Sequence, residues 1–178
     1  MVEYKTHILW LEDEFFGIMG LCGCISISDK IANTYGKDMK IFECKLYTEE
    51  LPKDSAEKIV YDVIENAGTE PAIVHLTTAQ LGRIYLEKYI PAAIISDSSF
   101  PLNGKRIVEW LKTHGLKQYP LIGFSGRNFH ELDPVMQEFF GSTCARYYRK
   151  LSTATADIID AVVFSKKYVE EIIVPDLK

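Results

Sequence analysis

The chain has 178 residues, of which 47% are hydrophobic and 25% are charged, a composition that excludes an intrinsically disordered chain. Its 20 basic and 25 acidic residues give a net charge of −5, so neither a nucleic-acid-binding nor an anionic-membrane-binding surface is indicated. The length predicts one domain over residues 1–178. The longest apolar run, 15–25, is shorter than the roughly 20 residues of a membrane span, and no signal-peptide pattern precedes it, so we expect a cytoplasmic protein.

Five short apolar runs are typical of strands in an α/β protein, because they alternate with segments of helical periodicity. These runs cover residues 6–11, 72–76, 92–96, 120–124 and 145–149. Nearly continuous apolar runs favour parallel strands that are buried on both faces of a sheet. The sequence therefore predicts a parallel sheet with five main strands.

The interval between the first two predicted strands is much longer than the dozen or so residues that a crossover connection needs. Alternating polar and apolar residues within it predict a strand over 39–47. A helix is expected to follow, in which Asp54 and Glu57 resemble a capping box and Gly68 marks the end. We therefore expect an inserted strand and helix at residues 37–68, and whether that strand joins the main sheet stays open.

Three further helices are predicted in the second half of the chain. The first begins near Asn103 and ends at Gly115. The second begins at Asp133, a capping residue, with Pro134 in the first helical position. The third carries a wide hydrophobic stripe over residues 158–173, which predicts that it docks on the sheet.

The cysteines and histidines show no spacing that is typical of a metal site. We expect the cysteines to be reduced thiols in the core of a cytosolic protein. They are Cys22, Cys24, Cys44 and Cys144. We expect the histidines to be structural or solvated. They are His7, His75, His114 and His130.

Polar residues follow four of the predicted strands. Glu12 and Asp13 follow the first strand and Asp97 the third, whereas Ser125 and Lys150 follow the fourth and fifth. Ligands of parallel sheets bind at the carboxyl ends of the strands, so these side chains are expected to converge. Three carboxylates repel one another unless they share a cation, and Mg²⁺ prefers such oxygen ligands. A hydroxyl and an ammonium would then contact phosphoryl oxygens, and one carboxylate could become an aspartyl-phosphate.

Four segments at the ends of predicted strands carry motifs that occur together in one protein family. Residues 8–14 are similar to an opening strand with its acidic pair, and residues 94–101 to a phosphoacceptor strand and its loop. Residues 124–126 are similar to a hydroxyl position followed by a small residue, and residues 147–150 to an aromatic switch position followed by lysine. Together they resemble the receiver domains of response regulators in two-component systems. The resemblance implies a flavodoxin-like receiver fold, a three-layer α/β sandwich with parallel sheet order 2-1-3-4-5, here with the inserted segment.

The resemblance also implies a phosphoacceptor site. Asp97 would accept a phosphoryl group from a histidine kinase or a phosphotransfer protein. Glu12, Asp13 and Asp97 would hold Mg²⁺, helped by the backbone carbonyl of Ser99. The expected function is phosphorylation-dependent signal transduction in a phosphorelay, without direct nucleic-acid or membrane binding.

Further roles follow from the same resemblance. Ser125 and Lys150 would act with Asp97 in catalysis by binding the phosphoryl oxygens. Ser125 would move toward the phosphate and Tyr147 would turn inward, so that the chain signals by protein contact. No enzymatic activity is expected beyond autophosphotransfer and autodephosphorylation at Asp97. The downstream partner is open, and so is whether the chain forms a homodimer.

Two alternatives stay open, because the chain departs from the family pattern. The interval from Asp13 to Asp97 is longer than usual, and Leu151 replaces the proline that usually follows the lysine. The first alternative is a pseudo-receiver, an interaction module that works without phosphorylation. The second is a Mg²⁺-dependent phosphohydrolase with Asp97 as nucleophile, against which Ser99 counts because such enzymes carry a second acid at that position.

Overall fold

The computed structural model describes residues 3–13, 40–70, 72–96, 113, 115, 121–125, 127–132, 134, 137 and 146–149. These residues form strands, two α-helices and a short 3-10 helix, η3 (Phe129–Glu131). The predicted α/β class is confirmed. The three helices predicted after residue 100 fall mostly outside the described residues. No helix in the described part of the chain is long and apolar enough to cross a membrane.

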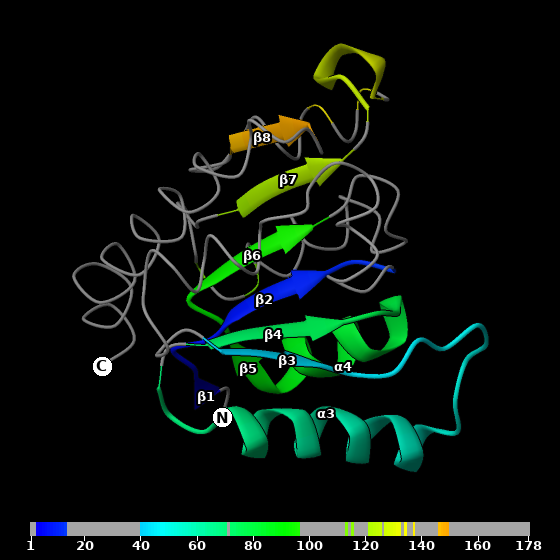
Figure 1. Cartoon of the computed structure of the whole chain (residues 1–178), viewed down its shortest axis with the longest axis vertical. Coiled ribbons are helices and arrows are strands. Elements are labelled where there is room, and N and C mark those ends of the chain that lie inside the picture. The colour runs from blue at the N-terminus through cyan, green and yellow to red at the C-terminus, as the bar shows by residue number, and fades with distance from the viewer. Residues whose placement is uncertain are drawn as a thin grey trace.

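The main sheet has six strands, and every neighbouring pair in it is parallel (Figure 1). In spatial order they are β3 (Lys40–Glu43), β4 (Ala72–Leu76), β2 (Ile8–Leu11), β6 (Ala93–Ser96), β7 (Leu121–Ser125) and β8 (Arg146–Arg149). All five predicted main strands are present, within two residues of their expected bounds. The inserted strand β3 joins the same sheet at its edge, beside β4, which answers the question that the sequence left open.

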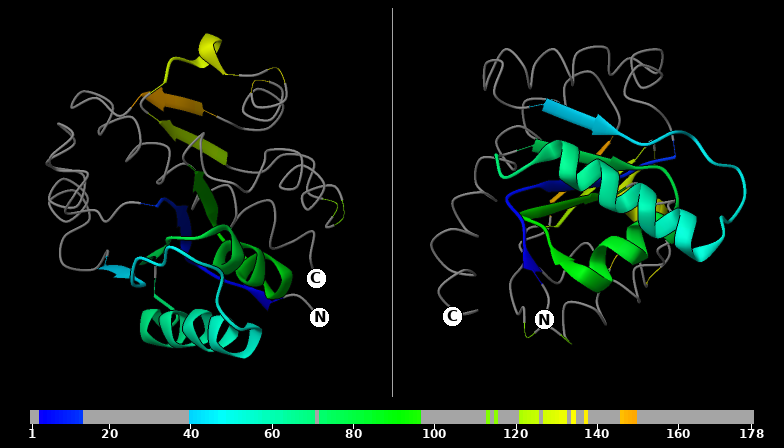
Figure 2. Two further views of the ribbon diagram at one scale, coloured as in Figure 1. Left: turned by 90° about the vertical axis from the view of Figure 1, so that its right-hand side faces the viewer. Right: turned by 90° about the horizontal axis from the view of Figure 1, so that it is seen from below.

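The two α-helices of the described chain cover one face of this sheet (Figure 2). Helix α3 (Lys53–Ala67) buries Ala56, Val60, Ile64 and Ala67, which lie three or four residues apart on one stripe. Helix α4 (Ala79–Lys88) begins at Thr78, whose hydroxyl accepts a hydrogen bond from Leu81 N at 3.3 Å. Both helices pack against alternate residues of the strands, so the hydrophobic core lies between this helical layer and the sheet.

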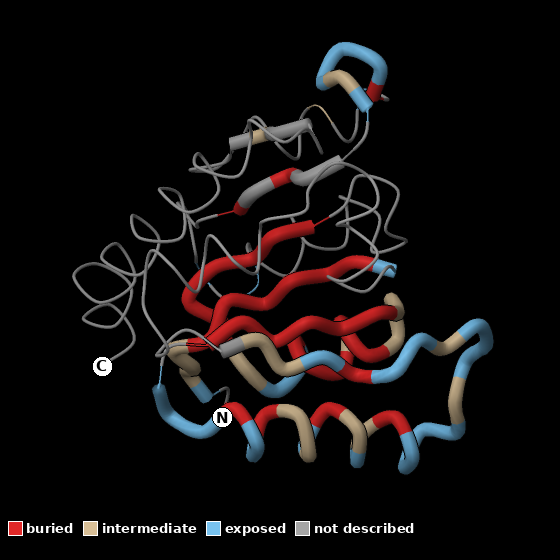
Figure 3. Tube along the Cα trace, viewed as in Figure 1, coloured by how far each residue is buried: buried red, intermediate tan, exposed pale blue. Residues whose placement is uncertain are grey.

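The central strands are buried along their whole length (Figure 3). In β2, Leu9 and Leu11 belong to the core beneath α3 and α4, whereas Ile8 and Trp10 point to the other face of the sheet and are also buried. Burial on both faces is the physical reason why these strands are apolar runs without alternation.

The predicted helix of the inserted segment is confirmed as α3, but its start differs from the prediction. Pro52 is the N-cap and makes no side-chain cap, so the expected capping box of Asp54 and Glu57 is wrong. Asp54 lies in the first turn instead, where its charge favours the positive end of the helix dipole. The end at Gly68 is confirmed: its φ is 69°, and its N–H donates to Ile64 O at 3.0 Å. Strand β3 covers four residues, less than the predicted 39–47.

A second, small sheet, which was not predicted from the sequence, pairs β1 (Glu3–Tyr4) in parallel with β5 (Tyr89–Ile90). Lys5 N donates to Ile90 O at 2.8 Å, which continues this pairing. Next to it, His7 bonds through Nε2 to Gly68 O at 2.8 Å. The segment before β2 is therefore attached both to the end of α4 and to the end of α3.

Candidate functional site

The carboxyl ends of the main strands lie side by side at one edge of the sheet (Figure 1). Leu11, the last residue of β2, pairs with Leu76 of β4 on one side and with Ser96 of β6 on the other. Ser96 in turn pairs with Gly123 of β7. This edge is therefore the place where the predicted site residues would meet.

The structure describes only part of the predicted site. Glu12, Asp13 and Tyr147 are among the described residues. For Ser125, the last residue of β7, only the backbone is described. The remaining predicted residues lie outside the described part of the chain. They are Asp97, Ser99 and Lys150.

The two acids after β2 have opposite environments. Glu12 is fully buried, and its N–H donates to Leu76 O at 3.2 Å, so it continues the pairing with β4 by one residue. Asp13 is exposed. The predicted acidic pair is thus one buried and one solvent-facing carboxyl on consecutive residues at the carboxyl edge.

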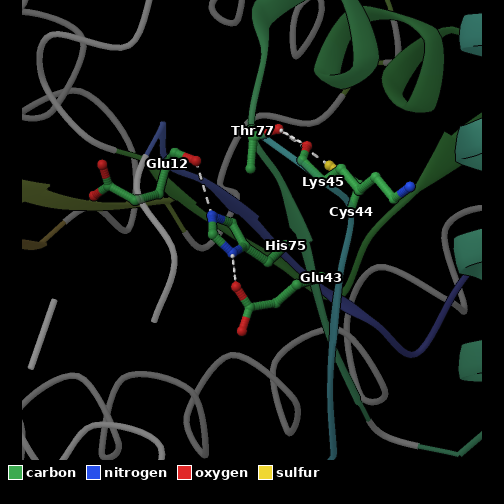
Figure 4. Close-up of polar contacts among 6 residues, drawn as sticks. All are labelled: Glu12, Glu43, Cys44, Lys45, His75 and Thr77. Carbon is green, nitrogen blue, oxygen red and sulfur yellow. Dashed lines mark hydrogen bonds and ion pairs between the residues drawn. The ribbon is translucent and has the colours of Figure 1, made fainter. Parts of the chain in front are cut away.

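A buried histidine links Glu12 to the inserted strand (Figure 4). His75 Nε2 lies 2.8 Å from the backbone oxygen of Glu12, and Nδ1 lies 3.1 Å from Oε2 of Glu43. The His75 side chain is 0% exposed and that of Glu43 is 29% exposed. The backbone oxygen of Glu12 only accepts hydrogen bonds, so His75 Nε2 donates to it. The buried ring of His75 therefore joins the end of β2 to Glu43 of the inserted strand.

Cys44 is a buried thiol next to this link (Figure 4). The hydroxyl of Thr77 donates to Lys45 O at 2.8 Å, so its single hydrogen is used there. The thiol of Cys44, 3.2 Å from Thr77 Oγ1, is then the donor of that contact. Burial raises the pKa of the Cys44 thiol, with a smaller opposing effect of Thr77. For Cys44 the expected reduced core thiol is confirmed; the other three cysteines lie outside the described residues.

The segment between β3 and α3 extends beyond the carboxyl edge of the sheet (Figure 1) and is fastened to α4. Gln80 holds the backbone of Leu51 by two hydrogen bonds, accepting from its N–H at 2.9 Å and donating to its carbonyl at 2.7 Å. Arg83 and Glu50 form an ion pair at 3.3 Å. The inserted segment is thus fastened to the first half of α4, the helix that follows the carboxyl end of β4.

Tyr147 connects β8 with the segment that follows β7. Its hydroxyl donates to Arg127 O at 2.8 Å, and its ring meets the ring of Phe129 edge-on at 5.6 Å between centroids. The residue is half-buried. Tyr147 therefore has two contacts that an inward turn would break; its role as a switch stays a prediction.

The donor atoms at this edge suit a hard cation better than a soft one. Within the described residues, no group of three or more His, Cys, Asp and Glu side chains could hold a metal ion. Both nitrogens of His75 are occupied by hydrogen bonds, and Cys44 is protonated, so neither is a metal ligand here. The carboxylates of Glu12 and Asp13 are oxygen ligands of the kind that Mg²⁺ prefers, and their place in a Mg²⁺ site stays a prediction.

Comparisons with protein-family models, with curated proteins and with solved structures find no match to this chain. The likeness to receiver domains therefore depends on the residues of this chain alone. Sequence reasoning missed the link between Glu43 and His75, although it expected His75 to be structural or solvated. A signal was present, since His75 is the one polar residue in the apolar run 72–76 and Glu43 lies on the polar side of the inserted strand.

Proposed function

We propose that this chain is a phosphoacceptor signalling protein. Asp97 takes a phosphoryl group from a histidine kinase or a phosphotransfer protein in a Mg²⁺-dependent reaction. The phosphorylated chain then signals through contact with another protein. In the transfer, a carboxylate oxygen of Asp97 attacks the phosphorus, the P–N bond of the donor phosphohistidine breaks, and the imidazole nitrogen that leaves takes up a proton.

The pairing of Leu11 with Ser96 is the observation that carries this proposal. Glu12 and Asp13 follow the first of these residues directly, and Asp97 follows the second. Acids that follow paired ends of parallel strands start from the same edge of the sheet, where ligands of α/β proteins bind. The order β4-β2-β6-β7-β8 supports the proposal further, because it equals the order 2-1-3-4-5 that the resemblance implies.

In this proposal each predicted residue has one task. Glu12, Asp13, Asp97 and the carbonyl of Ser99 hold Mg²⁺, which neutralises the crowded carboxylates and the incoming phosphoryl oxygens. Ser125 and Lys150 bind the remaining phosphoryl oxygens. The strand order accounts for this division between Mg²⁺ ligands and phosphoryl ligands. The acids follow β2 and β6, which are neighbours in the sheet, whereas Ser125 lies at the end of β7 and Lys150 directly follows β8, the next two strands.

The proposal is tested by phosphorylation with a small phosphodonor. The protein is incubated with acetyl phosphate and MgCl₂, and intact mass spectrometry is expected to show one phosphoryl group that is stable in acid and labile in base. Asp97→Asn should abolish the adduct, whereas Asp62→Asn, a matched change of an acid on α3, should leave it intact.

Other outcomes identify the alternatives. A wild-type chain that gains no mass and binds no Mg²⁺ contradicts the proposal and favours an interaction module that works without phosphorylation. Rapid multiple turnover of many phosphoesters would instead favour a phosphohydrolase.

A further inference from the structure

Glu43, His75 and Glu12 lie on the face of the sheet opposite α3 and α4. Glu43 pairs in register with His75, and His75 pairs with Trp10. Residues paired in register on parallel strands point to the same face, and Glu12, two residues after Trp10, points to that face as well. Figure 4 shows His75 between the Glu43 carboxylate and the backbone of Glu12.

We propose that His75, oriented by Glu43 of the inserted strand, is a positioning residue for the two acids of the Mg²⁺ site. This inference rests on the function proposed above. His75 touches no reacting atom in this role; it acts through the main chain of Glu12. The inserted strand then contributes to the site by supplying Glu43.

The backbone oxygen of Glu12 is the atom through which His75 acts. This oxygen lies in the plane of the peptide group that joins Glu12 to Asp13, and that plane is rigid. The N–H of Glu12 is held by Leu76 O at 3.2 Å, and its carbonyl by His75 Nε2 at 2.8 Å. Two fixed points on consecutive peptide groups orient the Cα–Cβ bond of Glu12 and place the Cα of Asp13, at the position where the strand pairing ends.

Glu43 gives this support its strength. The His75 side chain is 0% exposed, so the imidazole is held by its partners and not by water. The contact of His75 Nδ1 with Oε2 of Glu43 at 3.1 Å fixes the orientation of the ring, so that Nε2 points at the backbone oxygen of Glu12. Partners that orient the ligands of a metal commonly change its affinity by about 10–100-fold when they are removed.

The test compares two buried histidines, His75 and His7, each of which bonds to a backbone carbonyl oxygen. The His75 bond lies at the carboxyl end of β2 and the His7 bond at its amino end. His75→Leu removes the donor at the carboxyl end, and His7→Leu removes the donor to Gly68 O at the amino end, also at 2.8 Å. Mg²⁺ affinity is measured by calorimetric titration with MgCl₂, and the rate of phosphorylation by acetyl phosphate is measured as a function of Mg²⁺. We expect His75→Leu to weaken Mg²⁺ binding about tenfold, while His7→Leu lowers thermal stability and leaves Mg²⁺ affinity unchanged.

Two further variants separate positioning from a general structural role. Glu43→Gln keeps the side-chain shape and removes the charge, so an intermediate loss of Mg²⁺ affinity is expected. His75→Gln combined with Glu43→Gln restores a donor to Glu12 O and an amide pair between the strands, and should recover part of the affinity lost in His75→Leu. The Mg²⁺ concentration that gives the half-maximal rate of phosphorylation should rise in His75→Leu in parallel with the calorimetric loss of affinity.

The results distinguish this inference from the proposed function. A wild-type chain that binds no Mg²⁺ overturns both. Wild-type binding together with unchanged affinity in a folded His75→Leu variant overturns the positioning role alone. If His75→Leu does not fold, the Mg²⁺ affinity of Glu43→Gln is the deciding measurement. An unchanged Mg²⁺ affinity in Glu43→Gln then overturns the inference.

Discussion

Removal of the Tyr85 hydroxyl is expected to stabilise the protein. Tyr85 lies on α4 and is fully buried, and its hydroxyl has no hydrogen-bond partner within the described part of the chain. A buried polar group without a partner costs about 1–3 kcal/mol, the free energy of its lost hydration. Tyr85→Phe removes this cost and leaves a void of one oxygen atom, so we expect the free energy of unfolding to rise by about 1 kcal/mol.

Thermal and urea unfolding at neutral pH measure this change. In a chain of 178 residues, a gain of about 1 kcal/mol corresponds to an increase in Tm of about 2–4 °C. Tyr61→Phe is the matched control, because Tyr61 on α3 is 55% exposed and its hydroxyl needs no protein partner. A Tyr85→Phe variant that is less stable than the wild type would refute the reasoning, since the hydroxyl must then have a stabilising partner in the native protein.

The same variant changes how stability depends on pH. Burial raises the pKa of the Tyr85 hydroxyl well above its usual value, with smaller contributions from Tyr89 and Tyr4. The unfolded chain therefore releases this proton near pH 10, whereas the native chain keeps it. Stability is unaffected below about pH 10 and is lost as the pH rises above it. Between about pH 9 and 11, Tyr85→Phe should lose less stability than the wild type.

Two more predictions concern the junction between β2 and α3. Burial lowers the pKa of His7, so the unfolded chain takes up a proton near pH 6.5 before the native chain does, and stability should fall as the pH decreases below that value. Urea unfolding at about pH 7.5 and 5.5 should show that the free energy of unfolding decreases less for His7→Gln than for the wild type. An equal decrease in both proteins would contradict this prediction. Gly68→Ala should lower the free energy of unfolding by about 1–3 kcal/mol, because φ 69° and ψ −144° is a conformation nearly reserved for glycine. A β-carbon there would meet no atom within 4 Å, so unchanged stability in urea would show that the end of α3 relaxes.

Local patterns were sufficient to predict most of the described elements. The apolar run 72–76 matches β4 residue for residue, because a strand buried on both faces admits few polar side chains. The end of α3 at Gly68 was predictable, since glycine adopts a positive φ at little cost. The strand and helix of the inserted segment also followed from periodicity alone. Glu12 and Asp13 became candidate site residues for a local reason as well, because they come directly after an apolar run.

Tertiary structure decided the features that join distant parts of the chain. The place of β3 beside β4, and its register, bring Glu43 to His75 across 32 residues and His75 to Glu12 across 63. No short sequence window contains both partners of such a contact, and a register shift by one residue would turn Glu43 to the other face of the sheet. The start of α3 at Pro52 was likewise not predictable from Asp54 and Glu57, because the fixed path of the chain from β3, held through Leu51 by Gln80, sets where the helix begins. Composition and periodicity determine which segments become strands and helices, whereas the packing of those segments against one another determines which side chains meet.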